Sequence, residues 1–136
     1  MPRVTHSDGS RFAREYSYSR AVRAGRHIAV SGTAPIGPEG VLHPGDTYAQ
    51  AQAAIEKALA AAASLGATPG DVLRTRLLLA PGAVWEDAVR AHGEAFAGID
   101  PANTTYFVAG FIPDVLLEIE LDAILPEVPP AGRRRV

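Results

Sequence analysis

Two stretches of strong helix formers enclose an apolar run, and this alternation limits what the chain can fold into. The helical stretches are residues 48–65 and 84–96, where apolar side chains recur at three- and four-residue spacing. Between them, residues 72–79 have the composition of a strand that is buried on both faces. A helix, a strand and a second helix in this order predict a layered domain in which helices pack on a sheet through right-handed crossovers.

Paired strands are predicted on either side of this helical region. Residues 18–22 and 27–31 have strand patterns and are joined by a tight turn that contains Gly25. Residues 103–108 and 116–125 make the last two strands. The order β-β-α-β-α-β-β predicts an α+β fold, with one mixed sheet covered on one face by two helices.

The remaining segments are expected to contain little regular structure. Residues 32–46 hold four Gly and three Pro, which predicts a loop with a short strand near 41–42. Residues 1–15 are polar and without periodicity, and residues 126–136 are rich in Pro and Arg. We therefore expect both ends to be loosely ordered around a core of about residues 16–125.

Composition narrows the class of protein. The chain has 136 residues, which fits one domain, residues 1–136, and is too short for two. It has no cysteine, which excludes a disulfide framework and thiolate metal sites. The net charge of −2 argues against a nucleic-acid partner, and no stretch approaches the roughly 20 apolar residues of a membrane span. We expect a cytoplasmic protein with neither a nucleic-acid nor a membrane partner.

The sheet itself predicts a partner. Two helices can cover only one of its faces, and the alternating strands place apolar side chains on both sides. The uncovered face needs another protein surface against it, which predicts a closed homo-oligomer.

Familiar catalytic and metal-binding motifs are missing from the sequence. It contains no phosphate-binding loop, no glycine-rich dinucleotide fingerprint, no nucleophile elbow and no zinc-protease motif. The four histidines lie far apart without the spacing of metal ligands, so the motifs predict no metal site.

The last strand carries an unusual row of acids. Glu118, Glu120 and Asp122 alternate with leucine and isoleucine, so all three carboxyl groups share one face. One interpretation is a solvated face opposite a buried one. The other is that one carboxylate lies at a subunit cleft, where it handles protons or water. The pattern alone does not choose between them.

Seven segments spread over about residues 16–125 carry a family resemblance. They are residues 18–25, 28–33, 45–46, 71–76, 85–96, 101–104 and 117–120. In this order and at these distances they resemble the Rid family, also called the YjgF type (reactive intermediate/imine deaminases). The resemblance implies a chorismate-mutase-like fold and a homotrimer with a barrel-like core and clefts between neighbouring subunits. It also implies hydrolysis of enamines or imines to ammonia and a 2-keto acid, with no metal or organic cofactor.

The resemblance also assigns residues. In the family, a Tyr and a Ser line the cleft, a Glu on the last strand positions water, and an Arg clamps the substrate carboxylate. These positions fall on Tyr18, Ser31 and Glu118, whereas the Arg position holds Asn103. An amide has neither the charge nor the two-point geometry of a guanidinium. The chain therefore resembles a branch of the family that lacks the arginine.

Two arginines are candidates for a compensating positive charge. A helix position that often holds Asn in the family falls on Arg90, and Arg76 lies on the central strand. Salt bridges at the surface or at an interface are the alternative role for both.

Three functions follow from these observations. The first is a cofactor-free hydrolase or tautomerase of a small imine, enamine or related carbonyl compound. In that case Glu118 is catalytic, and Tyr18, Ser31, Arg90 and Asn103 contact the substrate. The second is a non-catalytic trimer that binds a small metabolite in the same clefts or acts as an interaction module. Endoribonuclease activity, which older family names imply, is a distant third, because no basic surface with aromatic residues is readable.

Overall fold

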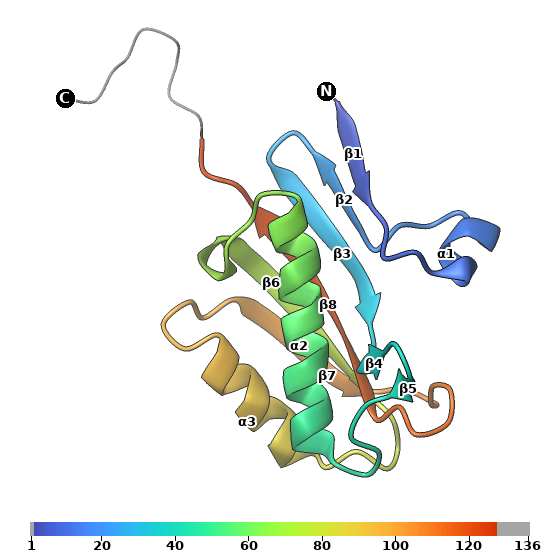
Figure 1. The fold of residues 1–136 in the computed structure, drawn as a ribbon. Helices are drawn as coiled ribbons and strands as arrows, with labels where there is room; N and C mark the ends of the chain where they lie inside the picture. Colours follow the sequence, from blue (N-terminus) through green and yellow to red (C-terminus); the bar gives the residue numbers. More distant parts are fainter. Residues whose placement is uncertain (1, 128–136) are drawn as a thin grey trace, which may run out of the picture.

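Six strands form one sheet, and two helices lie side by side against one of its faces (Figure 1). The computed structural model describes residues 2–127. From one edge of the sheet to the other, its strands are β1 (Arg3–His6), β2 (Ala21–Ala24), β3 (His27–Thr33), β8 (Leu117–Ile124), β6 (Val72–Leu79) and β7 (Ala102–Phe107). The other elements are α1 (Arg11–Glu15), the hairpin β4 (Ile36–Gly37) and β5 (Gly40–Val41), α2 (Thr47–Ser64), a 3-10 turn (Pro69–Asp71) and α3 (Trp85–Ala95).

The predicted order of strands and helices around one mixed sheet is confirmed. β6 and β7 are parallel because α3 connects them, and the other neighbouring strands of the sheet are antiparallel. β8 lies between β3 and β6, so Leu121 has Val30 as its partner on one side and Thr75 on the other. The last strand of the chain therefore joins the N-terminal hairpin to the βαβ unit.

The long helix α2 begins and ends within one residue of its predicted bounds. The Asp46 side chain accepts a hydrogen bond of 3.0 Å from the backbone N–H of Ala49, which caps the first turn. After the last turn, Gly66 takes a φ of +107°, a conformation that glycine adopts without steric cost. Within residues 2–127, no helix has the length and apolar character to cross a membrane.

The N-terminal segment differs from the loosely ordered lead-in expected for residues 1–15. β1 pairs with β2 and becomes the outer strand of the sheet, with Thr5 opposite Val22. α1 follows, and the Ser10 side chain accepts a hydrogen bond from Ala13 N. Pairing with a distant strand orders this polar segment, which is why its local pattern did not reveal it. The expected fraying of the C-terminal tail concerns mostly residues outside the described range.

The two faces of the sheet differ in chemistry. Side chains of β8 alternate, and Leu117, Ile119 and Leu121 are fully buried under the helices, as predicted. The opposite face is less apolar than expected, because half-buried charged side chains of β6 and β8 occupy it. Arg76 and Glu120 form an ion pair there at 3.6 Å. The homotrimer that would cover this face stays a prediction.

One buried polar side chain ties α2 to two loops. Gln50 is fully buried, and its amide nitrogen donates hydrogen bonds to the carbonyl oxygens of Leu42 (3.0 Å), His43 (3.3 Å) and Asp114 (2.8 Å). Its side-chain oxygen accepts a hydrogen bond of 2.8 Å from Leu116 N. The segment before α2 and the segment before β8 are therefore held together through one residue.

Replacing Gln50 with leucine tests this connection. Gln50→Leu keeps the volume but leaves buried backbone groups without partners, so we expect the free energy of unfolding to fall by about 2–4 kcal/mol. Urea denaturation followed by circular dichroism measures it. The matched control is Gln52→Leu on the exposed side of the same helix, for which we expect a change within about 0.5 kcal/mol. Equal stability of the two variants would contradict the role given to Gln50.

Candidate functional site

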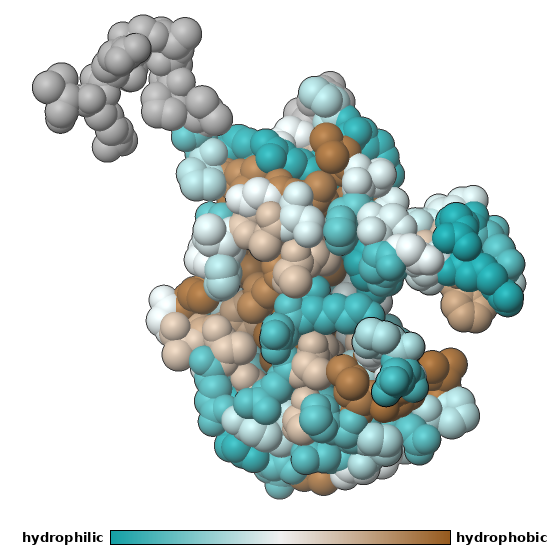
Figure 2. Space-filling view, viewed as in Figure 1, coloured by the Kyte–Doolittle hydropathy of each residue, from teal (hydrophilic) through white to brown (hydrophobic). Residues whose placement is uncertain are grey.

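An open pocket of about 950 Å³ lies where the N-terminal arm, residues 7–16, projects from the body of the protein. Figure 2 shows this region as an indentation between the arm that carries α1 and the rest of the surface. We call it the Glu118 pocket. Its lining residues are Asp8, Gly9, Ser10, Phe12, Tyr18, Arg20, Gly32, Ala34, Ile36, Pro38, Lys57, Phe111, Ile112 and Glu118.

A bulge in β3 shapes the floor of the pocket. Val30 is opposite Leu121 and Thr33 is opposite Ile119, so β3 has one more residue than β8 across this step. Such a bulge bends a strand and redirects its side chains. The extra residue falls at Ser31 and Gly32, which lie opposite Glu120 in the ladder, and the side chain of Glu118, two residues earlier in β8, reaches Gly32.

Gly32 makes room for the Glu118 carboxylate. A Cβ atom at position 32 would lie only 2.6 Å from Glu118 Oε1, which is closer than real Cβ contacts. The φ of Gly32 is outside the left-handed region, so an alanine could adopt this backbone. Contact with Glu118, and not backbone conformation, is therefore the reason for glycine at this position.

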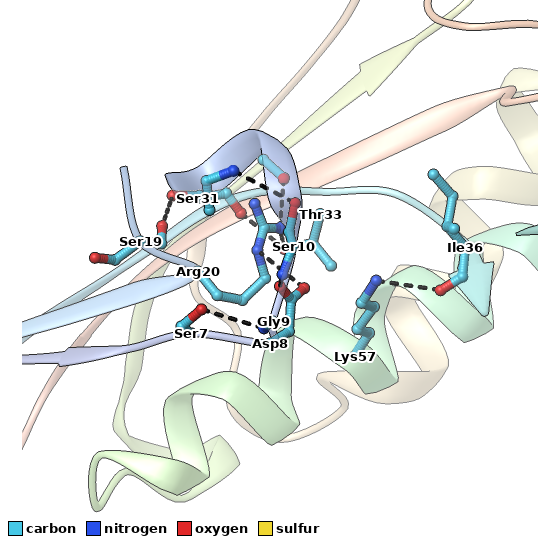
Figure 3. A network of polar contacts seen from close by, with 12 residues as sticks. Ser7, Asp8, Gly9, Ser10, Ser19, Arg20, Ser31, Thr33, Ile36 and Lys57 are labelled. Carbon is cyan, nitrogen blue, oxygen red and sulfur yellow. Dashed lines mark hydrogen bonds and ion pairs between the residues drawn. The ribbon is translucent and has the colours of Figure 1, made fainter. Parts of the chain in front are cut away.

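Arg20 places a positive charge beside Glu118. Its Nη1 donates to Gly32 O (2.7 Å) and to Thr33 Oγ1 (3.1 Å), and its Nε lies 3.7 Å from Asp8 Oδ2. Figure 3 shows the guanidinium between the arm and the end of β3. The Arg20 side chain is only 13% exposed. Arg20 thus fastens the arm to the bulge and stands in the same pocket as Glu118.

The environment of Glu118 changes its acidity. Partial burial raises the pKa of its carboxyl above the ordinary value of 4.5, the charge of Arg20 lowers it, and the neighbouring Glu120 raises it. Burial is the largest of these effects, so the net direction is upward. A carboxyl whose pKa is raised above its ordinary value suits proton transfer.

Tyr18 and Ser31, the other two residues that the resemblance assigned near this carboxyl, differ in whether they line the pocket. Tyr18 is 43% exposed and lines the pocket. Ser31 is outside the lining set, and its hydroxyl donates a hydrogen bond of 2.6 Å to Ser19 O (Figure 3). Ser31 therefore holds the segment that leads from Tyr18 to β2 against the bulge.

Arg90 and Arg76 lie elsewhere in the protomer. Arg90 is on the outer surface of α3, where it pairs with Asp87 (3.4 Å) and Glu94 (3.9 Å) and stacks on the ring of Tyr48. Arg76 is engaged with Glu120 on the uncovered face of the sheet. Neither arginine lines the Glu118 pocket.

Asn103 belongs to a different polar cluster in the protomer. It is exposed on the outer strand β7, and its amide nitrogen donates to Thr75 Oγ1 at 3.0 Å. Thr75 Oγ1 lies 2.7 Å from His92 Nε2, and burial lowers the pKa of His92. A neutral His92 that accepts the Thr75 proton completes this chain of hydrogen bonds.

Sequence reasoning found Tyr18 and Glu118 but missed two cations of the same pocket, Arg20 and Lys57. Arg20 was readable only as part of the resemblance in residues 18–25. Lys57 carries one signal, since it is the single lysine of a chain with 13 basic residues. Within the described range, no three His, Asp or Glu side chains are grouped as they would be to hold a metal ion.

Comparisons with known proteins agree with the fold. The family described as "Endoribonuclease L-PSP" matches residues 9–125. The crystal structure of Rv2704 from Mycobacterium tuberculosis, a member of the YjgF/YER057c/UK114 family, has a TM-score of 0.81 at 35% identity and covers 91% of this chain and 100% of that one. SCO2049 of Streptomyces coelicolor is 34% identical over 116 residues, 85% of this chain and 87% of its own. The RutC family protein PYRAB12510 of Pyrococcus abyssi is 32% identical over 104 residues, 76% of this chain and 82% of its own.

The contact between Gly32 and Glu118 can be tested without an activity assay. In Gly32→Ala we expect the carboxylate to swing toward solvent, because it is the movable end of a flexible side chain. The pKa of Glu118, measured by carbon-detected NMR titration, should fall toward 4.5 as burial is relieved. The free energy of unfolding should change by less than about 1 kcal/mol. Gly82→Ala is the matched control, since its Cβ would lie 3.7 Å from Leu116 Cδ2, an ordinary contact. An unchanged pKa in Gly32→Ala would contradict this account.

The raised pKa of Glu118 also predicts a pH-dependent stability difference. The ionised carboxyl is less favourable in the folded protein than in the unfolded chain, so Glu118→Gln should raise the melting temperature at neutral pH. Below pH 4.5 the Glu118 carboxyl is protonated in both the folded and the unfolded protein, so the difference in melting temperature should shrink. Scanning calorimetry of the wild type and of Glu118→Gln, from neutral pH to below pH 4.5, measures the difference in melting temperature and its dependence on pH. A variant that is less stable than wild type at neutral pH would refute the direction.

Proposed function

This chain belongs to the endoribonuclease L-PSP family, the family of the YjgF and RutC proteins, and from that premise we propose that it hydrolyses a small imine or enamine without a cofactor. The observation that carries the proposal is the Glu118 carboxyl, half-buried against Gly32 with a raised pKa in an open pocket. Apolar side chains, among them Phe12, Ile36 and Phe111, line the same pocket and suit a small organic substrate.

The proposed chemistry needs only water and one proton-transferring group. An enamine first becomes the imine by taking a proton on carbon and losing one from nitrogen. Glu118 then accepts a proton from water as the water oxygen adds to the C=N carbon, and it passes this proton to the nitrogen, which gives a neutral carbinolamine. Glu118 next takes the hydroxyl proton and delivers it to the nitrogen as the C=O bond forms and the C–N bond breaks, so the products are a carbonyl compound and ammonia. In this proposal Tyr18, which lines the pocket, hydrogen-bonds the substrate, and Ser31, which lies outside that lining, holds the backbone at Ser19, next to Tyr18.

The proposal includes the homotrimer. β7 is an outer strand with an exposed edge, and the uncovered sheet face carries half-buried charges, so both surfaces are open to neighbouring subunits. Asn103 does not line the pocket of its own protomer, and in the proposed trimer it contacts the substrate from a neighbouring one.

A second candidate function is binding without turnover. It is favoured by Asn103, which stands at the position of the carboxylate-binding arginine and whose amide already bonds to Thr75. In this case the same clefts hold a small metabolite, and ligands raise the melting temperature while no product forms.

RNA cleavage, which the family description implies, is not part of the proposal. Two acidic and two basic side chains line the Glu118 pocket, and the whole chain has a net charge of −2. RNA-binding surfaces are normally basic and offer aromatic side chains for base stacking.

Ammonia release tests the hydrolase. With a 2-aminoacrylate-type substrate generated in the assay, Glu118→Gln should lose at least about 100-fold in kcat, because general acid–base catalysis contributes on that scale. The control is Asp122→Asn, a carboxyl-to-amide change on the same strand and face, which should stay within about twofold. A wild-type rate equal to that of buffer would reject hydrolysis of this substrate class and leave the binding function.

A further inference from the structure

Lys57 is a cation without an acidic partner inside the Glu118 pocket. It is the only lysine of the chain, it lies on α2, and it is half-buried. Its Nζ donates one hydrogen bond of 3.1 Å, to the carbonyl oxygen of Ile36 (Figure 3). An ammonium group has three N–H donors, so two remain for other acceptors.

The other charged side chains that line the pocket leave the Lys57 ammonium without an ion pair. Asp8, Arg20, Lys57 and Glu118 are the charged side chains of the lining. Arg20 lies against Asp8 and also bonds to Gly32 and Thr33, and its charge lowers the pKa of Glu118. In the described part of the chain, Lys57 has no ion pair with any carboxylate.

We propose that Lys57 is the anion-binding residue of this pocket and holds the carboxylate of a small substrate. The ammonium is anchored at Ile36, next to apolar side chains that suit the remainder of such a molecule, while Glu118 faces its reacting carbon. The inference rests on the proposed function, because it takes the Glu118 pocket as the substrate site. It assigns the positive charge to α2, and not to Asn103, Arg90 or Arg76.

Lys57 is suited to this role by its position in the helix. α2 packs closely on the sheet through alanines, of which Ala51, Ala54 and Ala58 are fully buried. The Lys57 stem therefore starts from a fixed backbone, and its bond to Ile36 holds the charged end at the pocket wall. A charge held in place loses less conformational freedom when a ligand binds.

Equilibrium binding tests the inference independently of turnover. The full-length protein is titrated in a calorimeter with 2-oxobutanoate as the anionic probe and with 2-butanone as a neutral probe of similar shape. Lys57→Met keeps the stem and removes the charge, and it should weaken 2-oxobutanoate binding about tenfold or more while the affinity for 2-butanone stays unchanged. Lys57→Arg keeps the charge and should bind the anion within about threefold of wild type.

Two control variants show whether a negative result contradicts the role of Lys57 or the proposed hydrolase activity. Arg3→Met removes an exposed cation on β1, outside the pocket lining, and should leave both affinities unchanged. Glu118→Gln should still bind the anion, so a protein that binds through Lys57 but releases no ammonia refutes the hydrolase and keeps this inference. Anion binding by Lys57→Met at wild-type affinity, or no saturable binding of 2-oxobutanoate to the wild type, would overturn it. Melting curves of each variant confirm that it is folded.

Discussion

The site depends on one extra residue in β3. Across the step from Val30 to Thr33 the strand has one residue more than β8, and the bulge includes Gly32, which makes room for the Glu118 carboxylate. Glu118, Glu120 and Asp122 share one strand and one face, yet their surroundings differ. Glu120 pairs with Arg76, and Asp122 lies opposite Ala29 in the regular ladder. Glu120 is the acid opposite the bulge in the ladder, but the carboxyl that lies against Gly32 and near Arg20 is that of Glu118, and this sets Glu118 apart from its two neighbours.

α2 couples this site to the stability of the fold. Gln50 binds the carbonyl oxygens of Leu42 and Asp114, and two helical turns later Lys57 binds that of Ile36. These bonds hold the loop that follows β3 and the loop that precedes β8, the two segments that flank the pocket. A change on this side of α2 therefore affects both folding and the site. The outer side of the helix, with Gln52 and Glu56, is exposed and free of this constraint.

Local pattern was enough to predict most of the fold and less of the site. Periodicity placed α2 and β6 within one residue, because their apolar faces are determined by the sequence near them. β1 was missed because its order comes from pairing with β2, which no local pattern encodes. The resemblance led to Tyr18 and Glu118. Lys57 lines the pocket because the segment that carries Ile36 runs close to α2 and accepts its hydrogen bond, and no local pattern predicts the path of that segment. Arg90 and Arg76, the two candidates for a compensating charge, lie outside the lining of this pocket.

With Lys57 as the proposed cation, the charged groups that bind the anion come from the same chain as Glu118 and do not depend on the proposed trimer. Asn103 is exposed on the outermost strand and does not line the Glu118 pocket of its own chain, so its proposed contact with the substrate requires the proposed trimer. Lys57 and Glu118 belong to one protomer and are joined through the packing of α2 on the sheet. An added positive charge would normally lower the pKa of a nearby carboxyl and oppose proton transfer. Here Asp8 lies against Arg20 and partly offsets its charge, and burial remains the largest influence on Glu118. The pocket can therefore attract an anion without losing the raised pKa that its proposed chemistry requires.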